Sequence, residues 1–337
     1  MGRGNTLLKD ITPQQIKEAQ NIIKKEIDEW LSTNCTSEKS VTRIVAAKYN
    51  CYWETIYKTM NIPELEEYKS ETRGEALVYA DIPNEIYHSE VGISSSTLRK
   101  FGHSQLHAVN EVQKTTDAMN FGTAAHYMLV EGEEVYMNEV AVLMGSPYTK
   151  AYKENKVDML ERYDCVIKDA EDNHIRGMKA NIIDEADMYL QADGKLPEAS
   201  FFWYEDKVLC KCRPDLICPP FKGLSTPGEI YVVDYKTTKS CDPKQFADSV
   251  KHWGYDMQAA WYRRGMQKAG YVVKEFAFVA QEKLPPYASK IFVITDEQMD
   301  KAWDRMQVFL DAYNKYLDDG QTSIYNSGSI VTLDLED

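Results

Sequence analysis

Two short stretches decide the fold predicted for this chain: RPDLI at residues 213–217 and VVDYKTTKS at residues 232–240. Both place charged side chains directly next to a short apolar run: Asp215 in the first stretch, and Asp234 and Lys236 in the second. Charges are costly at such positions unless a partner compensates them. The two stretches are therefore the first candidates for a functional site.

The geometry of a β-strand predicts that these side chains meet. Alternation along a strand places Asp234 and Lys236 on one face and Tyr235 on the other. Pro214 cannot donate to a sheet ladder, so the first strand stops or lies at an edge there and releases Asp215 toward the same end. Two carboxylates repel each other unless a cation lies between them, and hard divalent ions such as Mg²⁺ select oxygen ligands. The pattern predicts a metal site for a phosphate substrate; the alternative is a surface ion pair between Asp234 and Lys236, with Asp215 only ending a strand.

Composition predicts a globular protein with an acidic surface. The chain has 337 residues, of which 43% are hydrophobic and 27% charged, enough for one large domain or for a small domain joined to a larger one. The net charge of -14 argues against a nonspecific nucleic-acid coat protein. It leaves room for an enzyme that binds divalent cations and meets DNA in a local basic channel. No secretory signal and no run approaching roughly 18 apolar residues is found, so we expect a cytoplasmic protein without a membrane segment.

The seven cysteines are expected to be reduced thiols, because their number is odd and no secretion signal precedes them. Four of them lie close together in the sequence without forming a C-x2-C pair. We interpret them as small buried strand and loop residues and disfavour an iron–sulfur cluster. The four are Cys210, Cys212, Cys218 and Cys241.

The N-terminal part is predicted to be a separate helical module, residues 1–62, followed by a linker at residues 63–76. Residues 40–60 resemble a helix-turn-helix in which Asn50 adopts the left-handed turn conformation. The alternative is a plain helical docking module. The linker is acidic, contains proline and glycine and has no apolar period.

The second domain, residues 77–337, is predicted to have an α/β fold with a mixed sheet flanked by helices. Two helices are expected at residues 243–269, closed by Gly270, and at residues 296–318, opened by a Thr295-x-x-Gln298 capping box. A further helix rich in small residues covers residues 118–132. The expected strands are residues 199–204, 207–213, 230–236, 276–281 and 290–295.

The order of these features resembles a known family. Gln258 and Tyr262 are four residues apart and share a helix face, and His126 lies on the small-residue helix. The series His126, Pro214-Asp215, Asp234-x-Lys236, Gln258-x3-Tyr262 resembles the PD-(D/E)xK nucleases of the RecB type. Six segments in one order are similar, more narrowly, to the nuclease domain of the RecE family (exodeoxyribonuclease VIII) of phages and prophages. They are GISSSTLRKF, FGTAAHYMLVEG, CKCRPDLI, VVDYKTT, MQAAWYRRGM and FVAQEKLPPY, and the resemblance spans residues 77–317.

The resemblance implies a restriction-endonuclease-like core and a role for each matching residue. Asp215 and Asp234 would bind Mg²⁺, or Mn²⁺ in its place, with the backbone carbonyl of Tyr235 and with His126. Lys236 would orient or help deprotonate the attacking water and stabilise charge on the scissile phosphate.

Other matching residues would support this site. Gln258 and Tyr262 would contact the DNA strand and buttress the metal ligands. Glu198 is a further acidic candidate around the metal, and Arg213 is a candidate phosphate contact.

The activity implied by the resemblance is Mg²⁺-dependent exonucleolysis of linear double-stranded DNA. Degradation would run from 5′ to 3′ and leave 3′ single-stranded tails for phage-type recombination. By the same resemblance the protein would form ring-like homo-oligomers, hand the tail to a RecT-like annealing protein and work in the cytoplasm of a bacterial host.

Two alternatives to this activity stay open. One keeps the fold but makes the protein a flap or single-strand nuclease of repair or defence. The other is a non-catalytic DNA-binding protein on a nuclease scaffold, against which the intact trio of Asp215, Asp234 and Lys236 argues.

Overall fold

The computed structural model describes most of the chain from residue 70 to residue 325, with gaps at 81, 91, 111–114, 220–227, 321 and 324. The predicted helical module, residues 1–62, lies outside the described residues. The described part opens with strand β1 (Ser70–Arg73), which pairs with β2 (Ala76–Tyr79), at the end of the segment predicted as a linker.

The central sheet has five strands in the order β11-β10-β9-β8-β5. Only β9 and β10 run parallel, and the other neighbours are antiparallel, so the predicted mixed sheet is confirmed. Most residues of its two long strands, β9 and β10, are buried on both faces, because helices cover both sides of the sheet. The strands are β5 (Leu196–Pro197), β8 (Leu216–Cys218), β9 (Glu229–Thr238), β10 (Val272–Glu282) and β11 (Ser289–Ile294).

A second, antiparallel sheet joins β1 and β2 to β6 (Ser200–Glu205) and β7 (Val208–Cys212). The sequence predicts one sheet for all of these strands, whereas the structure has two. The chain crosses from the second sheet to the central one between β7 and β8, at Arg213, Pro214 and Asp215. Pro214 has no N–H to give to a ladder, which fits a boundary between sheets.

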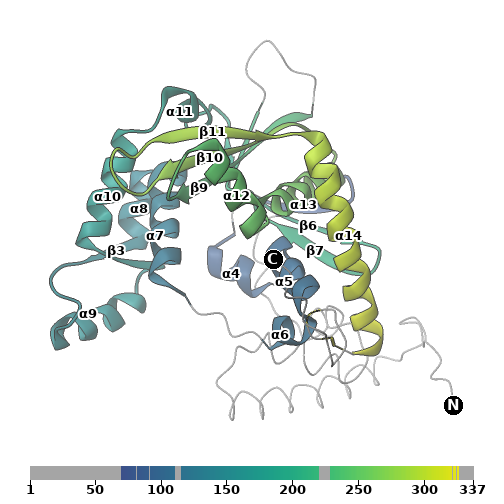
Figure 1. Ribbon diagram of the computed structural model, residues 1–337, viewed down its shortest axis with the longest axis horizontal. Helices are drawn as coiled ribbons and strands as arrows, with labels where there is room; N and C mark the ends of the chain where they lie inside the picture. The colour runs from purple at the N-terminus through teal and green to yellow at the C-terminus, as the bar shows by residue number, and fades with distance from the viewer. Residues whose placement is uncertain are drawn as a thin grey trace, which may run out of the picture.

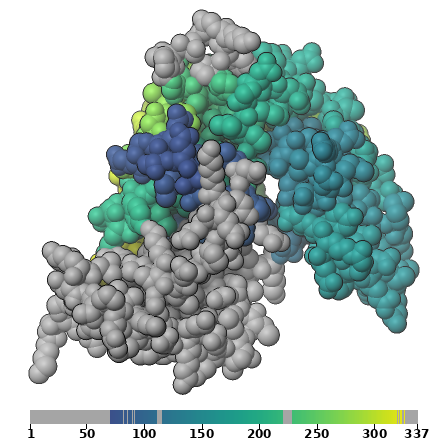
Figure 2. Space-filling model, turned by 180° about the vertical axis from the view of Figure 1, so that it is seen from behind, coloured from purple at the N-terminus to yellow at the C-terminus, as the bar shows by residue number. Residues whose placement is uncertain are grey.

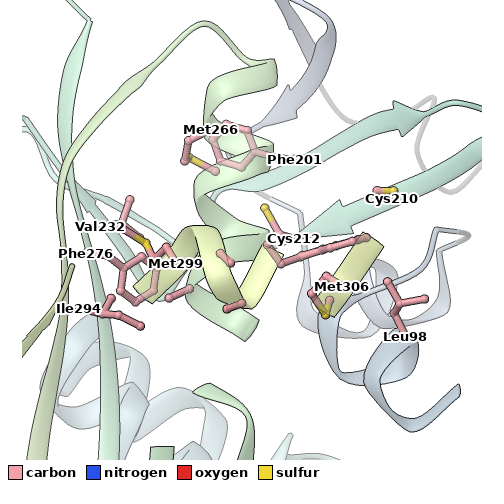
Figure 3. Packing of buried hydrophobic residues seen from close by; sticks show 14 of the residues in the cluster. Leu98, Phe201, Cys210, Cys212, Val232, Met266, Phe276, Ile294, Met299 and Met306 are labelled. Atoms are coloured by element: carbon pink, nitrogen blue, oxygen red, sulfur yellow. The ribbon is translucent and has the colours of Figure 1, made fainter. Parts of the chain in front are cut away.

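Helices cover the central sheet on two sides and form two cores (Figure 1). Val233 and Tyr235 of β9 point into the core on one side and Val232 into the core on the other, as strand alternation requires. The first core is covered by α7 (Asp117–His126), α8 (Glu133–Glu139), α10 (Asp169–Ala180) and α11 (Asp184–Leu190). The second, shown in Figure 3, is covered by α5 (Ser95–His103), α12 (Pro243–Trp253), α13 (Tyr255–Lys268) and α14 (Asp296–Asp319).

The remaining elements lie at the margins of this core. Seen from behind, an opening is visible beside the blue-teal part of the chain (Figure 2). Asn84 of α4 reaches this part, since its Nδ2 lies 3.5 Å from Asp164 Oδ2. The marginal elements are α4 (Asn84–Ser89), α6 (Gln105–Val109), α9 (Lys150–Leu160), β3 (Val140–Leu143) and β4 (Cys165–Lys168). No helix among the described residues is long and apolar enough to span a membrane.

The helix predicted at residues 243–269 is two helices, so this prediction is wrong in its continuity. Gly254 ends α12 and begins α13 with φ of 66°, in the left-handed region that interrupts a right-handed helix. The break turns α13 toward the end of β9. The helix predicted at residues 296–318 is confirmed as α14, and its Thr295–Gln298 capping box is present.

Replacing Gly265 by alanine is expected to destabilise the fold. A β-carbon at Gly265 would lie 2.8 Å from Cys212 Sγ and 2.8 Å from Trp203 Cζ3, because α13 packs closely on the second sheet there. Overpacking of this kind costs about 1–3 kcal/mol, which lowers the melting temperature of a domain of this size by about 2–10 °C. Thermal unfolding measures the change. Gly122→Ala is the matched control: its nearest atom would be Thr237 Oγ1 at 3.9 Å, so a melting temperature equal to or above that of the wild type is expected.

Candidate active site

The register of the central sheet brings Asp215 beside Asp234. Leu216 of β8 pairs with Val233 of β9, and β8 begins there, so Asp215 lies next to the stretch of β9 that β8 does not reach. The carboxylate takes the place of the missing strand, since the backbone N–H of Tyr235 donates to Asp215 Oδ2 at 2.7 Å. Because β8 begins at Leu216, the carboxylate of Asp215 is held in a fixed position beside β9.

Asp234 and Lys236 form a buried ion pair on the face of β9 that meets α13. The Asp234 side chain is 0% exposed and that of Lys236 is 17% exposed. Burial, reinforced by the negative charge of Asp215, raises the pKa of Asp234 to about 7 even though Lys236 favours its charged form. Burial opposes the charge on Lys236, but Asp234 and Asp215 outweigh it and raise the pKa of Lys236. Lys236 Nζ also lies 4.8 Å from the ring centroid of Tyr255.

His126 ends α7 and faces two carboxylates. Its Nε2 lies 3.1 Å from Glu198 Oε1 and 3.7 Å from Asp215 Oδ1. Burial alone would lower the pKa of His126, but the charges of Asp215 and Glu198 raise it well above its usual value. One ligand atom from each of the three residues lies within 4.8 Å of the others.

This cluster fits a divalent cation. His126 Nε2 is buried and lies against Glu198 Oε1 and Asp215 Oδ1 without a well-directed hydrogen bond to either. A buried polar atom left in this state is costly unless something binds it. Carboxylate oxygens suit Mg²⁺ and Mn²⁺, and an imidazole nitrogen is accepted more readily by Mn²⁺ than by Mg²⁺.

Glu198 is held in place by Arg213. The Arg213 guanidinium lies 2.9 Å from Glu198 Oε2, donates to the Glu198 carbonyl at 2.8 Å and also donates to the carbonyl of Ile82. Glu198 itself has φ of 52°, an unusual conformation for a residue with a side chain, and its N–H donates to the Asp215 carbonyl at 3.2 Å. The Arg213 side chain is only 8% exposed. This geometry makes Arg213 a support for Glu198 and gives no backing to the prediction of a phosphate contact.

Gln258 and Tyr262 lie on the first two turns of α13, directed at Asp234. Gln258 Nε2 lies 3.1 Å from Asp234 Oδ1, to which it donates, and 2.9 Å from the Tyr262 hydroxyl. Tyr262 is partly buried against the core. Gln258 therefore fixes the carboxylate of Asp234, and Tyr262 holds Gln258 in place.

Glu131 is a residue of the site that sequence reasoning missed. Its Oε1 lies 3.2 Å from His126 Nδ1, the ring nitrogen opposite the carboxylate cluster. In a regular α-helix, positions five residues apart point about 140° away from each other. Here α7 continues as a π-helical turn, Tyr127–Glu131, in which Gly132 N donates to the Tyr127 carbonyl, and five-residue neighbours share a face.

The described cysteines are buried thiols that lie outside this site. They are Cys165, Cys210, Cys212, Cys218 and Cys241. Burial raises the pKa of the Cys165 and Cys218 thiols to about 12.

A mixed sheet covered by helices, with Asp215, Asp234 and Lys236 gathered at the end of β9, defines a nuclease fold of the PD-(D/E)xK class. The chain belongs to the family described as a PDDEXK-like domain of unknown function (DUF3799), whose profile matches residues 94–333. This membership confirms the predicted superfamily and fold class.

Comparison with solved structures agrees on the fold. A protein from Eubacterium rectale described as a "Putative exonuclease" aligns with a TM-score of 0.51 and 14% sequence identity, covering 76% of this chain and 97% of that one. The structure of SSO0001 aligns at 10% identity over 64% of this chain and 85% of that one, with a TM-score of 0.25, too low to indicate a shared fold. No curated protein is significantly similar to the chain.

Proposed function

We propose that this protein is a divalent-metal-dependent exodeoxyribonuclease that degrades one strand of linear double-stranded DNA from its 5′ end and leaves a 3′ single-stranded tail. The observation that carries the proposal is the cluster of His126 Nε2, Glu198 and Asp215 beside the buried Asp234–Lys236 pair. Such a set combines groups that bind a hard cation with a fixed ammonium next to them. The polarity and the single-stranded product come from the resemblance to the RecE family.

The cation would be held by His126, Glu198 and Asp215, whose ligand atoms lie together. The resemblance adds Asp234 and the backbone carbonyl of Tyr235 to these ligands. Mg²⁺ is the expected ion, and Mn²⁺ suits the imidazole at least as well. When bound, the ion would lower the pKa of the attacking water and neutralise charge on the scissile phosphate.

Lys236 would act on the phosphate as a hydrogen-bond donor. Its ammonium is charged because Asp234 lies against it, and its side chain is 17% exposed. A fixed positive charge that is already oriented stabilises developing negative charge without reorganisation. Gln258 keeps the orientation by holding the other oxygen of Asp234.

Glu131 and Arg213 would act through their neighbours. The Glu131 carboxylate faces Nδ1 of His126, which leaves Nε2 directed at Glu198 and Asp215. The Arg213 guanidinium fixes Glu198 from behind. Contacts of this kind orient metal ligands, and their loss usually costs 10- to 100-fold in metal affinity or activity.

The assembly and the partner follow the same family resemblance. We propose a ring-like homo-oligomer that passes the 3′ tail to a RecT-like annealing protein in phage-type recombination. Light scattering of the purified protein measures its molar mass in solution and so tests the homo-oligomer. Co-purification with a RecT-like annealing protein tests the proposed partner.

The proposed activity predicts a specific pattern of DNA digestion. With Mg²⁺ or Mn²⁺, linear duplex labelled at its 5′ ends should lose its label early, whereas covalently closed circles should stay intact. EDTA should abolish digestion, because the carboxylate cluster then lacks its cation. Gel analysis of end-labelled linear and circular DNA provides the measurement.

Two results would count against this proposal. Linear DNA that survives the wild-type protein across Mg²⁺ and Mn²⁺ concentrations would refute the exonuclease and leave the two alternatives, the flap or single-strand nuclease and the non-catalytic DNA-binding protein. Cleavage of flaps or single-stranded circles with linear duplex left intact would favour the flap or single-strand nuclease.

A further inference from the structure

Two lysines lie beyond the catalytic end of β9 and are not used by the proposed chemistry. Lys283 follows the last residue of β10, and its backbone N–H donates to the Thr238 carbonyl at 3.1 Å. Thr238 ends β9 two residues after Lys236, about 7 Å along the strand, and on the same face. Lys239 comes directly after it. The backbones of both lysines therefore lie two to three residues, roughly 7–10 Å, past Lys236 along the strand.

The side chain of Lys283 lies on the helix that carries His126. Its Nζ is 5.4 Å from the ring centroid of Phe121, a buried residue of α7. Phe121 precedes His126 by five residues, about 7.5 Å along the helix axis. The ammonium is thus positioned between β9 and α7, the two elements that contribute Lys236 and His126.

Neither lysine has a carboxylate partner among the residues that the structure describes. Lys236 and Arg213 differ in this respect, because Lys236 pairs with Asp234 and Arg213 pairs with Glu198. Lys283 is partly buried, and burial together with the like charge of Lys239 lowers the pKa of the Lys283 ammonium. A partly buried cation beside a second cation is unfavourable until an anion binds.

We propose that Lys283 and Lys239 form a phosphate subsite, which binds a phosphodiester next to the scissile one on the same DNA strand. The inference rests on the proposed function and extends it to the path of the strand. A net charge of -14 repels DNA, so cations that are not already neutralised decide where the backbone lies. The strand would leave the carboxylate cluster past the end of β9 and along the first turns of α7.

The alternative for Lys283 is a structural contact with Phe121. Three substitutions separate the two roles. Lys283→Met keeps an unbranched stem on the ring and removes the charge, whereas Lys283→Arg keeps the charge and the cation–π contact. Lys239 is exposed, so Lys239→Met removes its charge with little effect on packing.

Binding of duplex DNA is measured by fluorescence anisotropy over a range of KCl concentrations, in EDTA so that no cleavage occurs. The double variant Lys283→Met with Lys239→Met is expected to bind about tenfold more weakly at low salt, and its salt slope should fall in magnitude by about 0.9, the value for one phosphate contact. Lys283→Arg should retain the wild-type slope. The control carries the same charge change on α14, as Lys301→Met with Lys315→Met, and should leave the slope unchanged.

Digestion kinetics with Mg²⁺ add a second readout. The lysine pair contacts the strand equally before and during reaction, so the double variant should raise KM about tenfold with kcat within about twofold of the wild type. If the wild type digests linear DNA and the double variant keeps its salt slope and KM, the subsite is refuted while the nuclease stands. A lower melting temperature of Lys283→Met with an unchanged slope would assign Lys283 to packing and also refute the subsite. Wild-type protein that neither binds nor digests DNA would overturn the proposed function itself.

Discussion

Asp215→Asn is expected to lower the rate of DNA digestion by about 10³-fold or more while the protein stays folded. Asp215 has two tasks, because Oδ1 faces His126 in the carboxylate cluster and Oδ2 accepts the N–H of Tyr235. An asparagine carbonyl still accepts that hydrogen bond, so the local backbone should keep its place. The amide lacks the charge that attracts a cation, and losses of 10²–10³-fold follow even when one fixed electrostatic contact is removed.

Metal binding gives this prediction a readout that is independent of activity. Titration of Mn²⁺ followed by electron paramagnetic resonance should show affinity reduced by at least about tenfold in Asp215→Asn. Asp248→Asn is the matched control: Asp248 is exposed on α12, so both its Mn²⁺ affinity and its activity should equal those of the wild type. Normal digestion by Asp215→Asn would remove this carboxylate from the proposed chemistry.

Lys236→Gln is expected to lower kcat by about 10²–10³-fold, with DNA binding in EDTA nearly unchanged. The reason is that Lys236 is already neutralised by Asp234 in the free protein and contributes its donor to the phosphate only as charge develops. The change also leaves Asp234 buried without its cation, which destabilises the fold. The loss of melting temperature should therefore be smaller with Mg²⁺ than with EDTA, because a bound cation restores the missing charge.

Single-turnover digestion with saturating enzyme measures the chemical step for Lys236→Gln, and thermal unfolding with and without Mg²⁺ measures the compensation. Lys244→Gln, at an exposed position of α12, is the control and should match the wild type in both. A kcat of Lys236→Gln close to the wild-type value would show that the ammonium only balances charge.

Local rules were sufficient to predict the arrangement around β9. Strand alternation depends on two neighbouring residues, so it places Asp234 and Lys236 together without knowledge of the rest of the fold. Pro214 likewise predicts from its own chemistry where strand pairing stops, and Asp215, the next residue, lies beside β9. The capping box at Thr295 and Gln298 likewise predicted the start of α14.

Features that depend on packing between distant parts of the chain could not be predicted from the sequence. The division into two sheets depends on which strands pair across long separations, and β2 pairs with β6 more than 120 residues later in the chain. The sequence does not predict the break at Gly254, because a single glycine is compatible with a continuous helix. The support of Glu198 by Arg213 needs a buried guanidinium, whereas the sequence shows only an arginine before a proline.

The π-helical turn at Tyr127–Glu131 has a consequence for how this segment tolerates insertions and deletions. A π-helical turn contains one residue more than the α-helical turn in the same place. Deleting one of residues 127–130 would return the turn to regular α-helical spacing and would place Glu131 four residues after His126, which is on the same helix face. The contact between Glu131 and His126 is therefore compatible with a turn one residue shorter, whereas at its present length the segment must stay π-helical to keep that contact.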